Sequence, residues 1–403
     1  MKVLMFHLLP YREPAPPTLR DPRHGLQVTI PKYLFDPDAA HRIYNDSLDE
    51  MELAASVGFD GLCVNEHHQM AYGMMPSPNL MLAALTRRTQ GLALVTLGTS
   101  AALYNPPTRV AEEFAMLDCV SGGRVIAGFP VGTSMDSNYA YGMNPALLRE
   151  RYYEAVELIT RAWVSEEPFS FDGNFTQLRY VSPWPRPFQS PHPPIWIPGG
   201  ASIETWAWTI EHDYLYAHLS YGGYQAAATS VNGYWETVDR LGKPRNPYRT
   251  AFLQLVCVGQ SEREVEETYG PHVEYFYNKL LQNTHPGFSE APGYRSLDSI
   301  RASLSRGRPL STADAGRSRT WKDFVSSGAV VAGTPKQVTE ELEHVATSLN
   351  IGHLLLLCQI GSMPHELATE NIRLVGTEVI PNLRQVFDDT GFADEWWLRG
   401  GRA

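Results

Sequence analysis

Short apolar runs alternate with amphipathic segments along most of the chain. Residues 59–64 and 92–100 carry almost no polar side chains, as is typical of strands buried on both faces of a parallel sheet. The segment 46–57 instead places Leu48, Met51 and Ala55 at helical spacing. No hairpin signal separates the first four apolar runs, so the pattern predicts parallel strands joined by crossover helices.

Continued to the end of the chain, this alternation predicts eight strands, each followed by a helix. We therefore expect an α/β protein with one domain over residues 1–403, a single (β/α)8 TIM barrel with insertions. A small hairpin at 169–175 is expected outside the main sheet. The expected barrel strands are 3–9, 59–64, 92–100, 124–129, 195–197, 214–219, 252–258 and 353–360.

Two stretches interrupt the alternation. Residues 11–45 form a first connection far longer than the usual βα loop of about 2–6 residues. Residues 284–327 are polar and rich in Lys and Arg in an otherwise acidic protein. We expect this second stretch to be an insertion that acts as a lid over an anionic ligand.

Composition narrows the classes of partner. The formal net charge of -11 argues against a nucleic acid, because phosphate neutralisation needs clustered Lys and Arg. No apolar run approaches membrane-spanning length and no secretory signal is recognised, so we expect a cytoplasmic protein without a membrane partner. The four cysteines lie far apart, which indicates buried free thiols rather than disulfides or a metal pair: Cys63, Cys119, Cys257 and Cys358.

The first candidate site follows the expected strand at 59–64. Asn65, Glu66, His67 and His68 come at its carboxyl end, where barrel enzymes keep their chemistry. Histidine can exchange a proton near neutral pH, although a pair of histidines can also simply cap a strand. Adjacent strand residues point to opposite faces, so we expect only one histidine to meet a ligand. A zinc site would need a third ligand at workable spacing, and we expect no metal.

A second candidate site precedes the helix expected to start at 203. Gly199, Gly200, Ala201 and Ser202 lie between a short strand and that helix. Glycine permits close backbone approach, and free N–H groups at a helix N-terminus attract anions. The segment is therefore either an ordinary turn or a phosphate cradle.

Taken together, several motifs are similar in order and spacing to one family, the bacterial luciferase-like flavin-dependent monooxygenases. The resemblance covers nearly the whole chain. It implies a barrel that binds reduced FMN at the carboxyl ends of its strands and reacts with O2 through a flavin C4a-(hydro)peroxide. The motifs are Glu66-His67-His68, residues 106–113, Leu117-Asp118, Ser121-Gly122-Gly123-Arg124, Gly128 and residues 331–335.

The resemblance also implies roles for individual residues. His67 aligns with the family's active-site histidine, with His68 and Glu66 as orienting neighbours, and these three form the candidate catalytic group. Thr99, Ser100 and Ala101 align with the segment that lines the flavin ring, with a non-prolyl cis peptide expected at Ser100–Ala101. Residues 199–202 align with the family's phosphate segment.

One departure from the family concerns the phosphate. Luciferase has a Cys-Arg pair after the fourth strand, whereas this chain has Pro130-Val131. The Glu-Ser of luciferase's cradle is replaced here by Gly199-Gly200. The charge partner must then come from elsewhere, and we consider Arg317, Arg319, Tyr139 and Tyr152 as candidates.

The resulting hypothesis is a two-component (group C) monooxygenase that takes FMNH2 from a separate flavin reductase and oxygenates a small organic substrate. The family implies a homodimer as the default assembly. Three alternatives remain open at this point: a deazaflavin (F420)-dependent hydride-transfer enzyme, a non-catalytic flavin-binding protein, and a metal-dependent hydrolase using Glu66 and His67.

Overall fold

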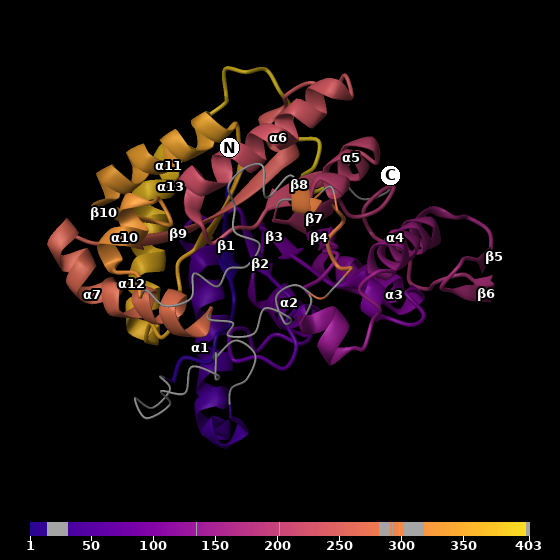
Figure 1. The fold of residues 1–403 in the computed structure, drawn as a ribbon, viewed down its shortest axis with the longest axis horizontal. Helices are drawn as coiled ribbons and strands as arrows, with labels where there is room; N and C mark the ends of the chain where they lie inside the picture. Colours follow the sequence, from indigo (N-terminus) through magenta and orange to yellow (C-terminus); the bar gives the residue numbers. More distant parts are fainter. Residues whose placement is uncertain are drawn as a thin grey trace.

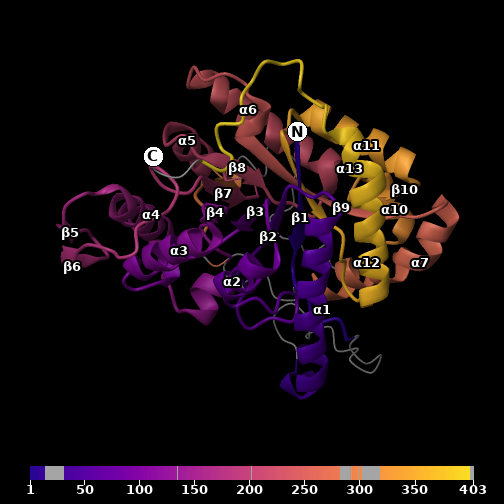
Figure 2. The same ribbon diagram turned by 180° about the vertical axis from the view of Figure 1, so that it is seen from behind.

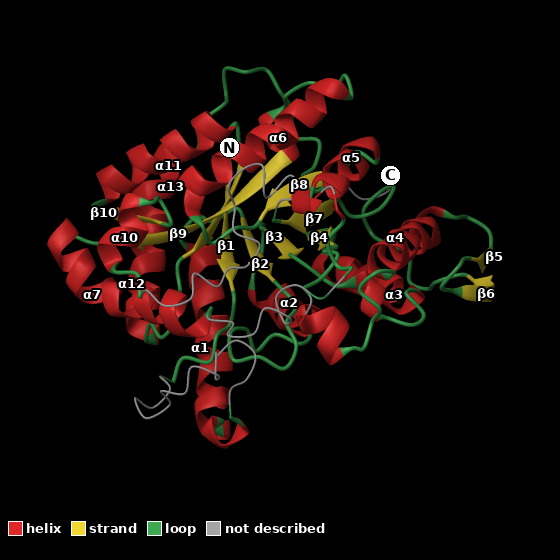
Figure 3. Cartoon of the chain, viewed as in Figure 1, coloured by secondary structure: helices red, strands yellow, loops and turns green. Residues whose placement is uncertain are grey.

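The computed structural model describes residues 1–13, 31–133, 135–200, 202–281, 291, 293–297, 299–301 and 318–399. Within this part of the chain, eight parallel strands form a closed barrel surrounded by helices (Figures 1 and 3). β9 pairs with both β8 and β11 and so closes the ring. The barrel strands are β1 (Lys2–His7), β2 (Gly61–Val64), β3 (Ala93–Thr96), β4 (Val125–Gly128), β7 (Ile195–Gly199), β8 (Leu215–His218), β9 (Thr250–Val258) and β11 (His353–Leu357).

Side-chain alternation along these strands builds two apolar layers. Leu4 and Phe6 of β1 belong to a cluster that fills the barrel interior, together with Trp196 of β7. Val3 and Met5 belong instead to the cluster between the strands and the helices. Both sets are buried, because a parallel strand covered on both sides must be apolar on both faces. All eight expected strands and the TIM-barrel class are confirmed.

Some helices begin or end at residues that elementary capping chemistry favours. Thr334 and Gln337 form a capping box ahead of Pro335, as their spacing predicts. Gly122 ends α3 with φ at 70°, a conformation that glycine adopts without strain. The helices that follow barrel strands are α1 (Pro37–Ser56), α2 (Pro78–Arg88), α3 (Thr108–Ser121), α4 (Leu148–Val164), α5 (Ile203–Glu211), α6 (Gly223–Arg240), α11 (Pro335–Leu349) and α12 (His365–Leu374).

The expected loop at 11–45 is shorter than predicted. Helix α1 begins at Pro37, where the Asp36 side chain accepts a hydrogen bond from the Asp38 amide. Ala39, Ala40 and Ile43 then continue the buried face of the helix. Our prediction of a start near residue 46 was wrong, because the Asp36-Pro37 cap was not recognised. Residues 14–30 of the loop lie outside the described residues.

An insertion separates β9 from α11. It contains α7 (Glu262–Tyr275), a π-helical turn η5 (Phe276–Leu280), α10 (Trp321–Ser326) and strand β10 (Val330–Gly333). β10 pairs with the second half of β9, outside the closed ring. The expected stretch at 284–327 is part of this insertion, but the lid hypothesis falls mainly on residues outside the described part.

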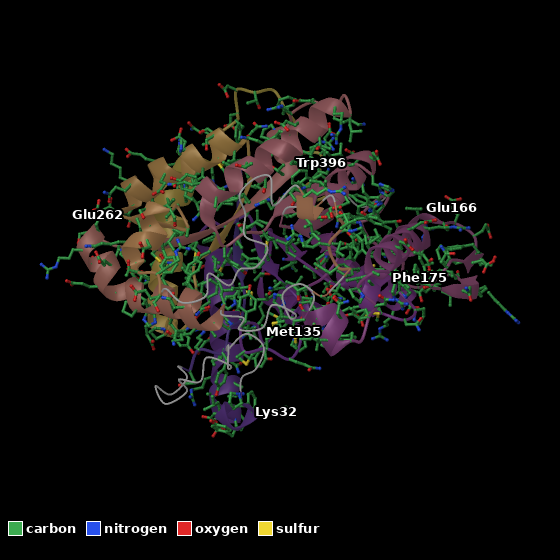
Figure 4. All side chains as sticks on the ribbon, in the orientation of Figure 1. Lys32, Met135, Glu166, Phe175, Glu262 and Trp396 are labelled. Atoms are coloured by element: carbon green, nitrogen blue, oxygen red, sulfur yellow. The ribbon has the colours of Figure 1, made fainter. Side chains whose placement is uncertain are left out.

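Two further segments frame the barrel. The expected hairpin is present as β5 (Phe169–Asp172) and β6 (Gln177–Val181), at the edge of the molecule beyond α4 (Figure 3). The last helical region is α12, followed by the π-helical turn η6 (Val375–Val379) and α13 (Ile380–Leu383), which Figure 2 shows from behind. The chain then returns to the barrel, where Trp396 is buried (Figure 4).

Candidate active site

His67 is held by a carboxylate that the sequence did not reveal. It follows β2, and its Nδ1 lies 3.0 Å from Oδ2 of Asp136, in the π-helical turn η3 (Met135–Ala140) that follows β4. The Asp136 Oδ1 accepts the backbone N–H of His68 at 2.8 Å, and its Oδ2 accepts the Thr133 hydroxyl at 2.6 Å. Figure 4 places Met135, the first residue of this turn, near the middle of the molecule.

The Asp136 carboxylate is ionised in this setting. Burial alone would raise the pKa of Asp136, but the charge of His67 and the hydrogen bonds from His67, Thr133 and the His68 amide lower that pKa below its ordinary value. An ionised carboxylate accepts hydrogen bonds and donates none. It therefore acts on His67 purely as an acceptor.

His68 belongs to a separate pair. Its Nε2 lies 2.9 Å from Oε1 of Glu66, whose side chain is almost completely buried. The other Glu66 oxygen accepts the Ser100 amide at 3.3 Å and the Tyr104 hydroxyl at 3.4 Å. On the outer side of His68, the Tyr141 hydroxyl lies 3.5 Å from Nδ1. Both ring nitrogens of His68 thus have neighbours within the protein.

These contacts correct one expectation. We expected Glu66 and His68 to orient His67, but Glu66 contacts His68 instead, and Asp136 contacts His67. The reason lies in geometry, because Glu66 and His68 are two residues apart in the turn after β2 and their side chains reach the same side. No spacing rule connects Asp136 with His67 across 69 residues.

The segment after β3 lines the neighbouring part of the barrel mouth. Thr99, Ser100 and Ala101 are all buried there, next to the Glu66 carboxylate. Within the described part of the chain, the Thr99 hydroxyl and the Asn65 side-chain oxygen are buried and have no hydrogen-bond partner. Both oxygens can accept a hydrogen bond, and both lie at the carboxyl ends of β2 and β3, beside the His67 and Glu66 segment.

The cis peptide is present at a different bond from the one expected. The structure has a non-prolyl cis bond at Leu97–Gly98, not at Ser100–Ala101. Gly98 approaches the next strand so closely that a Cβ on it would lie 2.3 Å from the carbonyl oxygen of Gly128. This close approach requires glycine at position 98.

The predicted phosphate cradle lies at the start of α5. A Cβ on Gly200 would have only the Leu219 carbonyl oxygen within 4 Å, so its backbone faces open space. The Arg149 guanidinium, from α4, donates to the Ser202 hydroxyl at 3.1 Å and to the Thr205 hydroxyl at 2.9 Å. Sequence reasoning missed Arg149, although it is one of two arginines in the first turn of its helix.

A carboxylate shares this cradle. Glu204 accepts the Ser202 hydroxyl at 2.8 Å and the Ser299 hydroxyl at 2.8 Å, and it also hydrogen-bonds to Ser296. Partial burial favours a higher pKa for Glu204, but these hydrogen bonds and Arg149 lower it below its ordinary value. Residues of the insertion therefore contact the α5 N-terminus through Glu204.

Two of the other phosphate candidates, Tyr152 and Arg319, are held elsewhere. Tyr152 is fully buried and donates its hydroxyl to the Phe129 carbonyl at 2.7 Å. Arg319 donates to the Ser327 hydroxyl at 2.8 Å and lies over the Phe324 ring, which ties it to α10. Tyr139 is about half exposed on η3. The remaining two candidates, Arg317 and Ala201, lie outside the described residues.

Three further observations concern other kinds of site. All four cysteines are free, and Cys119 is exposed whereas the other three are buried as expected. In the described ranges, no group of three or more His, Cys, Asp or Glu side chains is arranged to hold a metal ion. No helix of the described residues is both long and apolar enough to cross a membrane.

The fold and the site together define a (β/α)8 barrel with a histidine–carboxylate pair after β2 and the candidate cradle after β7. The chain matches the model of the luciferase-like monooxygenase family over residues 35–349. It belongs to that family, which includes flavin-dependent monooxygenases and F420-dependent oxidoreductases.

Curated monooxygenases are similar to parts of the chain. Limonene 1,2-monooxygenase of Rhodococcus erythropolis is 32% identical over 280 residues, which are 66% of this chain and 68% of that protein. The oxygenase component of the flavin-dependent trigonelline monooxygenase of Acinetobacter baylyi is 29% identical over 167 residues, 40% of this chain. The match spans less than half of that second relative, 45% of its length.

Solved structures show the same fold over nearly the whole chain. The oxygenating constituent of 3,6-diketocamphane monooxygenase from Pseudomonas putida, in complex with FMN, has a TM-score of 0.68 at 18% identity. The alignment covers 94% of this chain and 98% of that one. An F420-dependent secondary alcohol dehydrogenase has a TM-score of 0.65 at 18% identity, covering 95% and 99%.

Proposed function

We propose that the protein is an FMNH2- and O2-dependent monooxygenase of the two-component type, acting on a small organic substrate. The observation that carries the proposal is that the His67–Asp136 pair and the α5 N-terminus with Arg149 both lie at the carboxyl ends of strands of one barrel. The cradle follows β7 and His67 follows β2, with β3 and β4 between them in the sheet. A ligand with an anionic tail and a polar ring could span this arc.

The polar groups at the start of α5 suit the phosphate of FMN, and those after β2 and β3 suit its flavin ring. Arg149, Ser202 and Thr205 would hold the phosphate, since a guanidinium, two hydroxyls and a helix N-terminus are what a phosphate binds best. The unpartnered oxygens of Asn65 and Thr99 would accept hydrogen bonds from the flavin ring. Reduced FMN, when bound, supplies the activation of O2.

The protein's own side chains would then exchange a proton beside the flavin and limit the access of water to it. His67 would accept or return a proton beside the flavin, with Asp136 behind it. Tyr72 lies edge-on to His67 and hydrogen-bonds to Tyr221, and Phe276 stacks on Tyr72, so an aromatic wall limits water at this side. We propose His67 as the catalytic residue, with Glu66 and His68 as its buried neighbours.

Relatives named as flavin-dependent and limonene monooxygenases support this choice, and F420-dependent relatives support a hydride-transfer enzyme as the second candidate. We also propose a separate flavin reductase as the supplier of FMNH2, because the trigonelline enzyme is named as an oxygenase component. The homodimer remains a proposal from the family resemblance, and the cytoplasmic location remains a proposal from the sequence pattern.

The cradle is tested by comparing FMN with riboflavin, which lacks the phosphate. R149M should weaken FMN binding about 10- to 100-fold, because a charge-assisted hydrogen bond contributes about 1.5–3 kcal/mol, and should leave riboflavin binding unchanged. R161M changes another arginine of α4, which lies over the Phe169 ring, and serves as the matched control. Equal loss of FMN and riboflavin binding in R149M would contradict the proposed phosphate site.

A further inference from the structure

We propose that Asp136 is a positioning residue that fixes His67 with its proton on Nδ1 and leaves Nε2 as the acceptor. The two adjacent histidines then differ in role: His67 exchanges the proton with the ligand, and His68 is held inside the protein. The catalytic consequence rests on the proposed function, whereas the position of the proton can be tested without any flavin.

Both oxygens of Asp136 are already in use. Oδ1 accepts the His68 amide at 2.8 Å, while Oδ2 lies 3.0 Å from His67 Nδ1 and 2.6 Å from the Thr133 hydroxyl. The Asp136 side chain is 3% exposed, so water does not replace these partners. A buried ionised carboxylate at this distance requires a proton on the facing nitrogen, and in neutral His67 that nitrogen is Nδ1.

The ring of His67 is also held against rotation. Tyr72 packs edge-on with ring centroids 5.0 Å apart. On another side, a Cβ on Gly73 would lie 3.2 Å from Cδ2 of His67, so the backbone there packs directly on the imidazole. If the His67 ring were rotated by 180°, Cδ2 rather than Nδ1 would face Asp136, and the carboxylate would lose the hydrogen bond from His67.

Of the two adjacent histidines, only His67 has a ring nitrogen that is available to a ligand. Among the described residues nothing hydrogen-bonds to its Nε2, and its side chain remains 13% exposed. His68 has Glu66 at Nε2 and the Tyr141 hydroxyl near Nδ1. The geometry therefore separates two neighbouring residues that the sequence alone could not distinguish.

An asparagine at position 136 makes the proposal testable. The backbone N–H of His68 can only donate, so the amide oxygen of D136N must face it. The amide nitrogen then faces His67 and Thr133, and as a donor it requires Nδ1 of His67 to accept. D136N should therefore move the His67 proton from Nδ1 to Nε2 with little change in side-chain volume.

The experiment is nitrogen NMR on the full chain labelled with 15N-histidine, with His67 assigned from H67Q. We expect an Nδ1–H tautomer for His67 in the wild type and an Nε2–H tautomer in D136N. E66Q is the matched control, since it changes the carboxylate of the other pair: His68 signals should shift while those of His67 stay. An Nε2–H tautomer in the wild type, or an unchanged tautomer in D136N, would overturn the proposal.

The wild-type spectrum decides the question even if D136N does not fold. In folded D136N reconstituted with FMN and a reductase, kcat should fall about 10²- to 10⁴-fold while FMN affinity is unchanged, because the proton is misplaced but the cradle is intact. Loss of FMN affinity equal to the loss of kcat would indicate a merely structural role. If no FMN turnover exists at all, the proposed function fails, and the tautomer result still stands or falls separately.

Discussion

At the scale of single residues, the role of each histidine and hydroxyl group in the site depends on which carboxylate it contacts. Asp136 and Glu66 each hold one histidine, and Glu204 occupies donors that a phosphate would also need. The histidines could be located from the sequence because they follow a strand directly. Their partners could not, because contacts between residues 67 and 136 or between 149 and 202 arise only when the barrel closes.

Glu204 should oppose the binding of the cofactor's phosphate. Its ionised carboxylate shares the Ser202 hydroxyl with the cradle, and a phosphate dianion placed there would be repelled by it. E204Q should therefore strengthen FMN binding about fivefold or more and leave riboflavin binding unchanged. E211Q, at the far end of α5, is the control. Weaker FMN binding by E204Q in a titration would show that Glu204 supports the site instead.

At the scale of elements, a buried polar cluster ties β1, α1 and α12 together. Glu50 of α1 is fully buried and accepts hydrogen bonds from both terminal nitrogens of Arg12, at 2.7 and 2.8 Å. His7 lies 2.9 Å from the same carboxylate and His365 lies 3.1 Å from it. The cluster holds the start of the first loop against two helices, away from the interior of the barrel.

This cluster predicts how stability depends on pH. Burial opposes ionisation, but hydrogen bonds from His365 and His7 and the charge of Arg12 lower the pKa of Glu50, so its contribution is present above its ordinary pKa near 4.5 and is lost as pH falls. Burial lowers the pKa of His7, whose contribution is likewise lost below about 6.5. The Glu50 hydrogen bond raises the pKa of His365, whose contribution is instead lost as pH rises.

We therefore expect the free energy of unfolding to be highest near pH 6.5. It should fall above that pH through His365, fall below it through His7, and fall steeply below pH 5 through Glu50. E50Q should cost about 3–5 kcal/mol at pH 7, because it leaves Arg12 buried without a counter-charge, and should flatten the acid branch. Urea unfolding at several pH values measures both effects. An acid branch of equal slope in E50Q would assign the acid sensitivity to other groups.

The elements themselves were predicted unevenly, for physical reasons. Buried parallel strands are apolar on both faces, and the capping box at Thr334 is a local signal, so both could be recognised from the sequence. The early start of α1 and the short strand β10 were missed. β10 has only four residues and forms because β9 extends beyond the barrel and offers a free edge, which no local pattern shows.

At the scale of the whole molecule, the last described segment of the chain packs against the barrel through Trp396. Trp396 is 2% exposed, and its carbonyl accepts the Trp196 indole N–H at 3.0 Å. Its own indole N–H donates to the Asp213 carbonyl at 2.9 Å, and the Arg249 guanidinium lies 4.4 Å from its ring. A distant segment thereby supports β7, the strand that leads into the cradle.

Removing this contact should destabilise the whole fold. W396A is expected to cost about 3–5 kcal/mol, the usual loss for a buried Trp replaced by Ala, and it also removes the indole N–H that donates to the Asp213 carbonyl. Y180A, which removes an aromatic side chain that is 70% exposed on β6, should change stability by less than about 0.5 kcal/mol. Denaturant unfolding of the two variants checks this, and equal stabilities would show that the tail is not part of the core.

The overall architecture was the most predictable property, because strand–helix alternation over the whole chain leaves few topologies other than the barrel. The chemistry of the mouth was predicted only in part. His67 and the segment at 199–202 could be located from local sequence, whereas Arg149 and Asp136 come from other strand ends. Their roles follow from closure of the ring rather than from any motif.

Binding of reduced FMN at the carboxyl ends of the barrel strands, and its reaction with O2 there, can be measured without knowing the substrate. The most direct measurement is an anaerobic titration of the protein with FMNH2 and, in parallel, with the reduced deazaflavin, each followed by rapid mixing with O2. We predict saturable binding of FMNH2, weakened by R149M, and a reaction with O2 at a rate different from that of free FMNH2. Saturable binding of the reduced deazaflavin alone, with no binding of FMNH2, would contradict the account.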